Sequence, residues 1–334
     1  MKTRLKIALI STVFLISSCT YANNNKEDSN SMLDLNNTKD WCSGRYTFKL
    51  PQSAILSGGG DNFHSFKITS KVNATQADLD MAYKNLLKEH SSPVTKIILD
   101  SPQKKIGNKI IKVFSGKLGT AERGALDAYG FALDKGVLFS LKLTYSLSKK
   151  DIVFSELNEI LVNLTARNNN QIPKEAGICI ANGFIKDDGK EFTKSLNSLA
   201  FQFKGLPSVR LSLEVDAAST QLADLITRKE KFLKEKGLLN LTTSSFKTIS
   251  KGQKNQIGGD HLTGLEWVST APMKGQNGVL ATWEHAGVAK NALDPAIQLE
   301  IDTGFDGNNI QTSSLNEKES LKLYETILNT IKKF

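Results

Sequence analysis

Four stretches of helical periodicity, separated by groups of alternating strands, restrict this chain to a mixed architecture of helices and sheets. Apolar residues recur at helical spacing in residues 74–89, 148–164, 220–236 and 316–332. Between these stretches, apolar and polar residues alternate with the period of two that is typical of strands. This alternation predicts strands at residues 44–50, 64–72, 109–117, 125–133 and 137–145 in the first half, and at 177–185, 195–203, 209–215, 245–251, 262–269, 278–284 and 296–302 in the second.

Both halves of the sequence show the same order of strands, a helix, further strands and a second helix. This order predicts an α+β fold of two similar domains, each an antiparallel sheet with two helices packed on one face. The polar stretch 167–171, followed by Pro173, marks the boundary. The predicted domains are therefore residues 39–168 and residues 169–334.

The first 18 residues have the layout of a secretory signal peptide, with basic residues before a short apolar stretch. That stretch is too short to span a bilayer, which takes about 20 apolar residues. The sequence Ile16-Ser17-Ser18-Cys19 resembles the bacterial lipobox, in which the Cys thiol receives diacylglycerol. Residues 1–18 are therefore predicted to be a lipoprotein signal peptide and Cys19 the site of lipid attachment. The alternative is an ordinary signal peptide that is cut after Ala22.

The residues after Cys19 predict where the anchor holds the protein. Thr20 stands where an Asp would favour retention in the inner membrane, so we expect a lipid-anchored protein at the inner leaflet of the outer membrane, in the periplasm. Residues 19–38 are rich in Asn, Ser and charged residues and offer little apolar surface to bury. Such a segment cannot offset the entropy lost on ordering, which predicts a flexible tether.

The chain has a formal net charge of +9. Removing residues 1–18 takes away three basic residues and no acidic one, which leaves a net charge near +6. The excess is spread through Lys-rich helices, which favours a solvated surface near anionic lipid. A basic face for an acidic protein partner is the alternative. A nucleic-acid partner is not expected in the periplasm.

Two cysteines remain besides Cys19. Cys42 and Cys179 form an even pair in an oxidising compartment, which favours a disulfide between them. Such a bond would close a loop of well over a hundred residues and add about 4–5 kcal/mol of stability on the chain-entropy estimate. Two separate buried thiols are the alternative.

The sequence contains no arrangement that is typical of an active site, a cofactor site or a metal site. No Gly-x-Ser-x-Gly, Gly-x-Gly-x-x-Gly or His-Glu-x-x-His motif is present. Asp260–His261 and Glu284–His285 are neighbours on predicted strands or turns, and adjacent strand residues point to opposite faces, so neither pair predicts an acid–base dyad. Gly58-Gly59-Gly60 is interpreted as a mobile turn. We therefore expect no enzyme activity, no cofactor and no metal.

Two further groups of residues allow a functional and a structural interpretation. Asp187-Asp188-Gly189-Lys190 and Asp306-Gly307-Asn308-Asn309 are reminiscent of calcium loops, but they fit ordinary turns better because Asp, Asn and Gly are turn residues. Trp267 and Trp283 are interpreted as core or interdomain aromatics, with an interface anchor as the alternative.

Three motifs resemble immunity proteins that are paired with type VI secretion lipase effectors. They are Trp41-Cys42-Ser43-Gly44-Arg45-Tyr46 with Leu50-Pro51, then Gly177-Ile178-Cys179-Ile180-Ala181-Asn182-Gly183-Phe184-Ile185, and Gly264-Leu265-Glu266-Trp267. The resemblance is to the two-domain class and covers most of the mature chain. It implies a periplasmic, lipid-anchored protein whose two domains clamp a cognate lipase or phospholipase toxin and inhibit it non-covalently. The resemblance assigns no effector-contacting residue. A general periplasmic lipoprotein that binds a small ligand or another envelope protein is the alternative.

Overall fold

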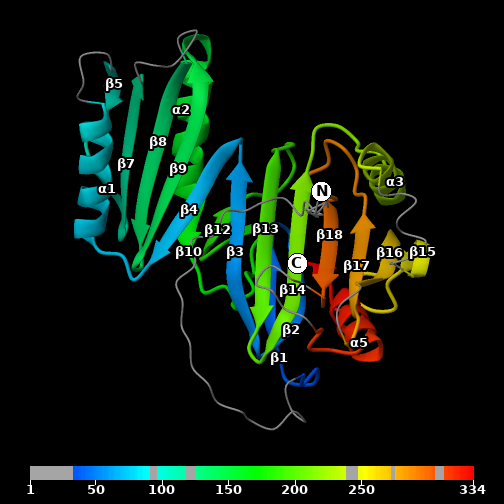
Figure 1. Ribbon diagram of the computed structural model, residues 1–334. Helices are drawn as coiled ribbons and strands as arrows, with labels where there is room; N and C mark the ends of the chain where they lie inside the picture. Colours follow the sequence, from blue (N-terminus) through cyan, green and yellow to red (C-terminus); the bar gives the residue numbers. More distant parts are fainter. Residues whose placement is uncertain (1–32, 91–95, 118–124, 238–246, 272–274, 305–311) are drawn as a thin grey trace, which may run out of the picture. The chain divides into compact units, whose positions relative to one another are not determined.

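One long antiparallel sheet includes strands from both halves of the sequence. The computed structural model describes residues 33–90, 96–117, 125–237, 247–271, 275–304 and 312–334. Within them, the sheet has 13 strands in the order β15-β16-β17-β18-β14-β13-β3-β4-β9-β8-β7-β5, with β6 also paired to β7 (Figure 1). The strands are β3 (Ala54–Phe63), β4 (Phe66–Val72), β5 (Lys96–Asp100), β6 (Lys104–Ile106), β7 (Lys109–Lys117), β8 (Ala125–Asp134), β9 (Val137–Ser146), β13 (Ser195–Phe203), β14 (Leu206–Ala217), β15 (Thr248–Asn255), β16 (Thr263–Ala271), β17 (Gly278–His285) and β18 (Ala296–Asp302).

Two small sheets, four α-helices and a 3₁₀ helix (Leu147–Lys149) complete the described structure. One small sheet contains β1 (Thr38–Ser43), β2 (Tyr46–Pro51) and β19 (Lys332–Lys333), and the other contains β10 (Leu164–Ala166), β12 (Gly183–Lys186) and β11 (Gly177–Ile180). The helices are α1 (Gln76–Glu89), α2 (Lys150–Asn163), α3 (Leu225–Glu235) and α5 (Glu317–Leu328). None of the helices in the described ranges is both long enough and apolar enough to cross a bilayer. The α+β class is as predicted.

The helices of each half lie on opposite faces of the long sheet, and the prediction that they share one face is wrong. In β7, Val113 faces the core that contains Leu157 of α2, whereas the next residue, Phe114, faces the core that contains Leu79 of α1. Apolar residues on both faces of β7 and β8 make this possible, because each face can bury a helix. By strand register, α2 and α5 cover one face of the sheet, and α1 and α3 cover the other.

The two main hydrophobic cores exchange segments across the predicted boundary. Trp41, Tyr46 and Phe48, from the start of the chain, pack in the same core as α5. Conversely, β11 and β12 contribute Ile178, Ile180 and Ile185 to the core under α2. Leu33 and Leu35 also pack against the α5 core, so the last residues of the predicted tether are part of the fold. The division at residues 168 and 169 stays a prediction.

A disulfide lies where the exchanged segments meet. Cys42 in β1 and Cys179 in β11 are bonded, with their Cα atoms 5.8 Å apart. Beside the bond, Gly44 N donates to Cys179 O at 2.9 Å and Cys179 N donates to Gly44 O at 2.8 Å. The bond therefore links the hairpin of one core to the small sheet of the other.

The three-glycine run forms part of a strand, so its interpretation as a mobile turn is wrong. Gly58, Gly59 and Gly60 lie inside β3 and pair with Ala200, Leu199 and Ser198 of β13. A Cβ atom on Gly59 would lie 2.4 Å from the carbonyl oxygen of Ser198. Glycine is therefore needed here for the close approach of two backbones rather than for a reversal.

Asp61 is buried where β3, β13 and the β11–β12 turn meet. Its carboxylate accepts hydrogen bonds from Asn197 Nδ2 and Ala181 N, both at 2.9 Å. Burial raises the pKa of Asp61 from its ordinary value of 3.8 to about 6, although the two hydrogen bonds and the charge of Arg167 oppose the shift.

Replacing both cysteines by serine (Cys42→Ser with Cys179→Ser) should lower the free energy of unfolding by about 4–5 kcal/mol, because the unfolded chain regains the entropy of a long loop. Urea unfolding with and without reductant measures the effect. Reductant should destabilise the wild type and leave the double variant unchanged. Two free thiols in the mass of the denatured wild type would contradict the bond.

Replacing Asp61 by asparagine should remove part of the pH dependence of stability. The pKa of Asp61 in the folded protein lies above its ordinary value, so folding favours the protonated carboxyl. The free energy of unfolding of the wild type should therefore fall by up to about 3 kcal/mol as pH rises from 4 through 6. Urea unfolding at pH 4.5, 6.0 and 7.5 should show a smaller loss for Asp61→Asn. Asp151→Asn, at the exposed start of α2, is the matched control. Equal losses in wild type and Asp61→Asn would contradict the prediction.

Candidate protein-binding surface

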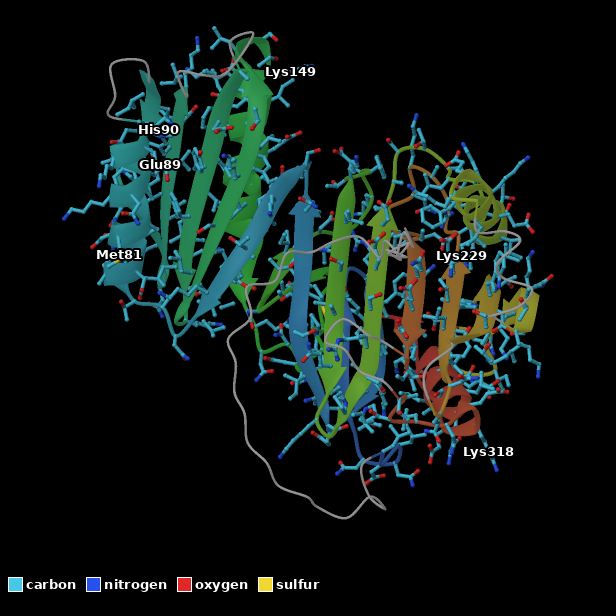
Figure 2. All side chains as sticks on the ribbon, viewed as in Figure 1. Met81, Glu89, His90, Lys149, Lys229 and Lys318 are labelled. Atoms are coloured by element: carbon cyan, nitrogen blue, oxygen red, sulfur yellow. A yellow bond between two sulfur atoms is a disulfide. The ribbon has the colours of Figure 1, made fainter. Side chains whose placement is uncertain are left out.

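Between α1 and α3, the long sheet is open on the face against which these two helices pack. There, β4, β3, β13, β14 and β18 have no described helix or strand over them, and Figure 1 shows these strands between the two helices. We call this surface the open strip. Side chains that point from it, such as Thr69, Ser212 and Glu214, are exposed. Figure 2 marks Met81 on α1 and Lys229 on α3, the helices that border the strip.

The open strip is flat in its centre and changes charge along its length. Gly58 and Gly60 of β3 lie beside Ala200 and Ser198 of β13, so short side chains form the centre. On one side, β4 presents exposed lysines, Lys67 and Lys71. On the other side, β14, β17 and β18 present carboxylates to the same face, namely Glu214, Asp216, Glu284 and Glu300. Such a surface can form contacts with a large partner.

A groove lies at the acidic end of the strip, beside the start of α3. Its lining includes Leu222, Arg228, Val288, Glu214, Asp216 and Glu284. The side chain of Asp224 accepts from Thr227 N at 2.9 Å and caps α3. The helix therefore begins at Leu225 and not at Thr220 as predicted. Leu222 lies outside the helix and is 55% exposed, which adds an apolar side chain to the groove.

Two cations of α3, Arg228 and Lys229, are already engaged by the sheet. Arg228 forms a two-point ion pair with Glu284, with one Nη1–Oε1 distance of 3.1 Å, and also donates to Ala223 O. Lys229 Nζ donates to Thr282 Oγ1 at 2.6 Å. Among the residues that the structure describes, the side chains of Glu214 and Asp216 have no hydrogen bond or ion pair within 4 Å.

The unpaired carboxylates of the groove and Lys229 of α3 have shifted pKa values. Loss of hydration over the sheet, together with repulsion from Asp216 and Glu284, raises the pKa of Glu214 above its ordinary value, and Arg228 only partly opposes the shift. Loss of hydration also raises the pKa of Asp216. For Lys229 the same loss of hydration lowers the pKa, against the attraction of Glu300 and Glu284.

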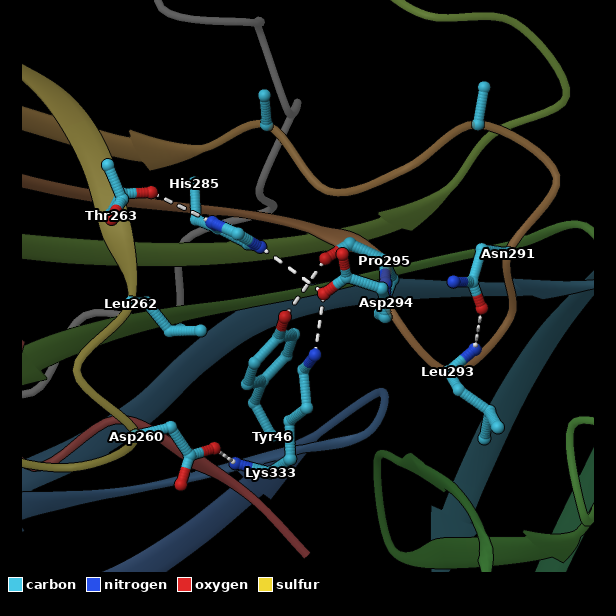
Figure 3. Close-up of polar contacts among 12 residues, drawn as sticks. Tyr46, Asp260, Leu262, Thr263, His285, Asn291, Leu293, Asp294, Pro295 and Lys333 are labelled. Carbon is cyan, nitrogen blue, oxygen red and sulfur yellow. Dashed lines mark hydrogen bonds and ion pairs between the residues drawn. The ribbon is translucent and has the colours of Figure 1, made fainter.

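The side chain of His285 forms structural contacts. His285 Nδ1 lies 2.8 Å from Thr263 O and its Nε2 lies 3.3 Å from Asp294, which also pairs with Lys333 at 2.5 Å (Figure 3). Glu284 instead points to Arg228, so the adjacent Glu284–His285 pair does not meet. In the described ranges, no Ser, Thr or Cys side chain hydrogen-bonds a histidine. The carboxylate partner of His285, Asp294, could not be identified from sequence spacing.

The other residues singled out in the sequence have structural positions or lie outside the described ranges. Cys42 and Cys179 are buried in the disulfide, away from the groove. Trp283 is fully buried in the α5 core, as predicted, while Trp267 is half-buried beneath Lys251 on the α3 side. Asp187 pairs with Arg45 in a turn. Cys19 and residues 306–309 lie outside the described residues, among which no group of three or more His, Cys, Asp or Glu side chains could hold a metal ion.

Comparisons with known proteins give a consistent family and fold. Residues 171–333 match the family model for the Tle cognate immunity protein 4 C-terminal domain. Over this half of the chain, the predicted resemblance is confirmed. No curated protein matches the sequence.

Three solved structures are similar in fold. Apo TplEi, an immunity protein of the type VI secretion system from Pseudomonas aeruginosa, has 19% identity and a TM-score of 0.71, and the match covers 89% of this chain and 97% of that one. The Tle4–Tli4 complex matches with 19% identity, a TM-score of 0.71, and coverage of 90% and 99%. TplEi complexed with an "L" peptide matches with 20% identity, a TM-score of 0.68, and coverage of 90% and 99%.

Proposed function

We propose that this chain, whose residues 171–333 are a Tle cognate immunity protein 4 C-terminal domain, is an immunity protein that binds and inhibits a cognate type VI secretion phospholipase effector. The observation that carries the proposal is that family match, supported by a likeness in fold that covers 89–90% of the chain. The protein acts by binding and catalyses no reaction itself.

The open strip is the surface on which we place the effector. Its flat centre allows close contact with a folded partner, and the charges at its two ends allow discrimination between partners. A stable inhibitory interface buries about 1,600 Å² in total. The strip with the adjoining sides of α1 and α3 offers a continuous surface for such an interface, whereas the opposite face of the sheet is covered by α2, α5 and the small sheets.

We further propose that the protein is held in the periplasm by lipid on Cys19, at the inner leaflet of the outer membrane. The lipobox-like Ile16-Ser17-Ser18-Cys19 and the preceding apolar stretch support this. Residues 19–32 reach at most about 50 Å when extended, so the folded part stays near the membrane that a phospholipase attacks. Tethering raises the local concentration of an inhibitor there.

Mixing the purified mature protein with the phospholipase encoded beside its gene should abolish hydrolysis of a fluorogenic phospholipid at a molar ratio near one to one. Binding that covers or locks the effector predicts a linear loss of activity up to equivalence, which a titration measures. The control is the same titration with heat-unfolded protein. Full lipase activity at a twofold excess of folded protein would contradict the proposal.

Replacing Cys19 by serine should prevent lipid attachment and release the protein from the membrane fraction, because the thioether cannot form. Labelling of cells with an alkyne-tagged palmitate, followed by fractionation, measures both effects. Cys42→Ser is the matched control and should keep its label. A mature wild-type protein that begins at Asn23 would show that cleavage follows Ala22 and would overturn the anchor.

A further inference from the structure

We propose that the groove beside α3 receives a lysine or arginine side chain of the effector, and that this contact distinguishes the cognate effector from others. The inference rests on the proposed function and assigns part of the interface to a partner of defined chemistry. It differs from the expectation that basic surface on this chain meets an acidic partner.

The shape and lining of the groove fit a long basic side chain. Leu222 and Val288 line it and are 55% and 53% exposed, and three small residues, Ala218, Ala286 and Ala289, also line it. Lysine and arginine have apolar stems and charged heads. The stem can pack against Leu222 and Val288 while the head reaches the carboxylates of β14.

The charges in the groove are complementary to a cation. Four carboxylates point from β14, β17 and β18 to this end of the strip: Glu214, Asp216, Glu284 and Glu300. Of these, only Glu284 belongs to an ion pair among the described residues, with Arg228. Lys229 is bound to Thr282, and Lys194 acts on Asp216 only at longer range. Glu214 and Asp216 therefore remain available to a cation from outside the chain.

The unpaired carboxylates of Glu214 and Asp216 contribute little to the stability of the free protein. The raised pKa values of Glu214 and Asp216 mean that their charged forms are disfavoured in the free protein. A bound cation would favour those charged forms. This balance is expected for a recognition surface, whereas carboxylates with a structural role have partners within the fold.

The test neutralises both carboxylates without changing their shape, in the variant Glu214→Gln with Asp216→Asn. Its affinity for the effector, measured by biolayer interferometry in 50 and 300 mM NaCl, should be at least about tenfold lower than that of the wild type at the lower salt. The difference should shrink at the higher salt, because screening weakens the wild-type contact.

A matched control carries the same change of charge on α2 and α5, the helices that cover the opposite face of the sheet. Glu159→Gln on α2 with Glu317→Gln on α5 also removes two exposed carboxylates. It should bind within about twofold of the wild type if the position of the charges matters, rather than the net charge of the chain. The groove variant should unfold at a temperature equal to or above that of the wild type, which separates lost binding from lost folding.

The outcomes distinguish the inference from the proposed function. If the wild type inhibits the effector and the groove variant binds equally well, the inference is overturned and the immunity function stands. If the wild type fails to bind the effector, the proposed function falls. An equal loss in groove variant and control would mean that overall charge governs binding and would also overturn the inference. So would a concentration-dependent dimer of the wild type that the groove variant abolishes, because the occupant would then be a second copy.

Discussion

The pairing of β3 with β13 makes one sheet from strands that belong to two hydrophobic cores, and the rest of the structure depends on it. Gly59 allows the two backbones to approach, and Asp61 and Asn197 join side chains across the same pair. Because side chains alternate along each strand, a continuous sheet gives both halves a common pair of faces. α1 and α3 are therefore on one face, with the open strip between them.

The exchange of segments explains why a bond between Cys42 and Cys179 stabilises more than its own surroundings. The β1–β2 hairpin packs in the α5 core and the β10–β12 sheet packs in the α2 core, so neither core is built from one continuous piece of chain. A disulfide with paired backbone hydrogen bonds at this crossing limits how far the cores can separate. The geometry of the open strip is then set by covalent and hydrogen-bonded contacts rather than by a flexible linker.

Local signals in the sequence predicted local structure well and long-range structure poorly. The four helices and the core position of Trp283 follow from spacing and residue type. The strand role of Gly58-Gly59-Gly60 and the opposite placement of α1 and α2 depend on strand register, which spacing within one segment does not contain. The groove was missed for the same reason: its carboxylates come from three strands, and only Glu214-x-Asp216 is visible as a local alternation.

The acidic groove also gives a reason why a positively charged chain can be selective near a membrane. Lysines spread over the surface attract any anionic surface, including lipid, and carry little information about the partner. Unpaired carboxylates in a basic protein act differently, because an effector without a cation at the matching position would leave Glu214 and Asp216 desolvated and unpaired. Specificity then arises from a cost imposed on the wrong partner as well as from a contact with the right one. On this view, the tether determines where the protein meets an effector, and the groove determines which effector it holds.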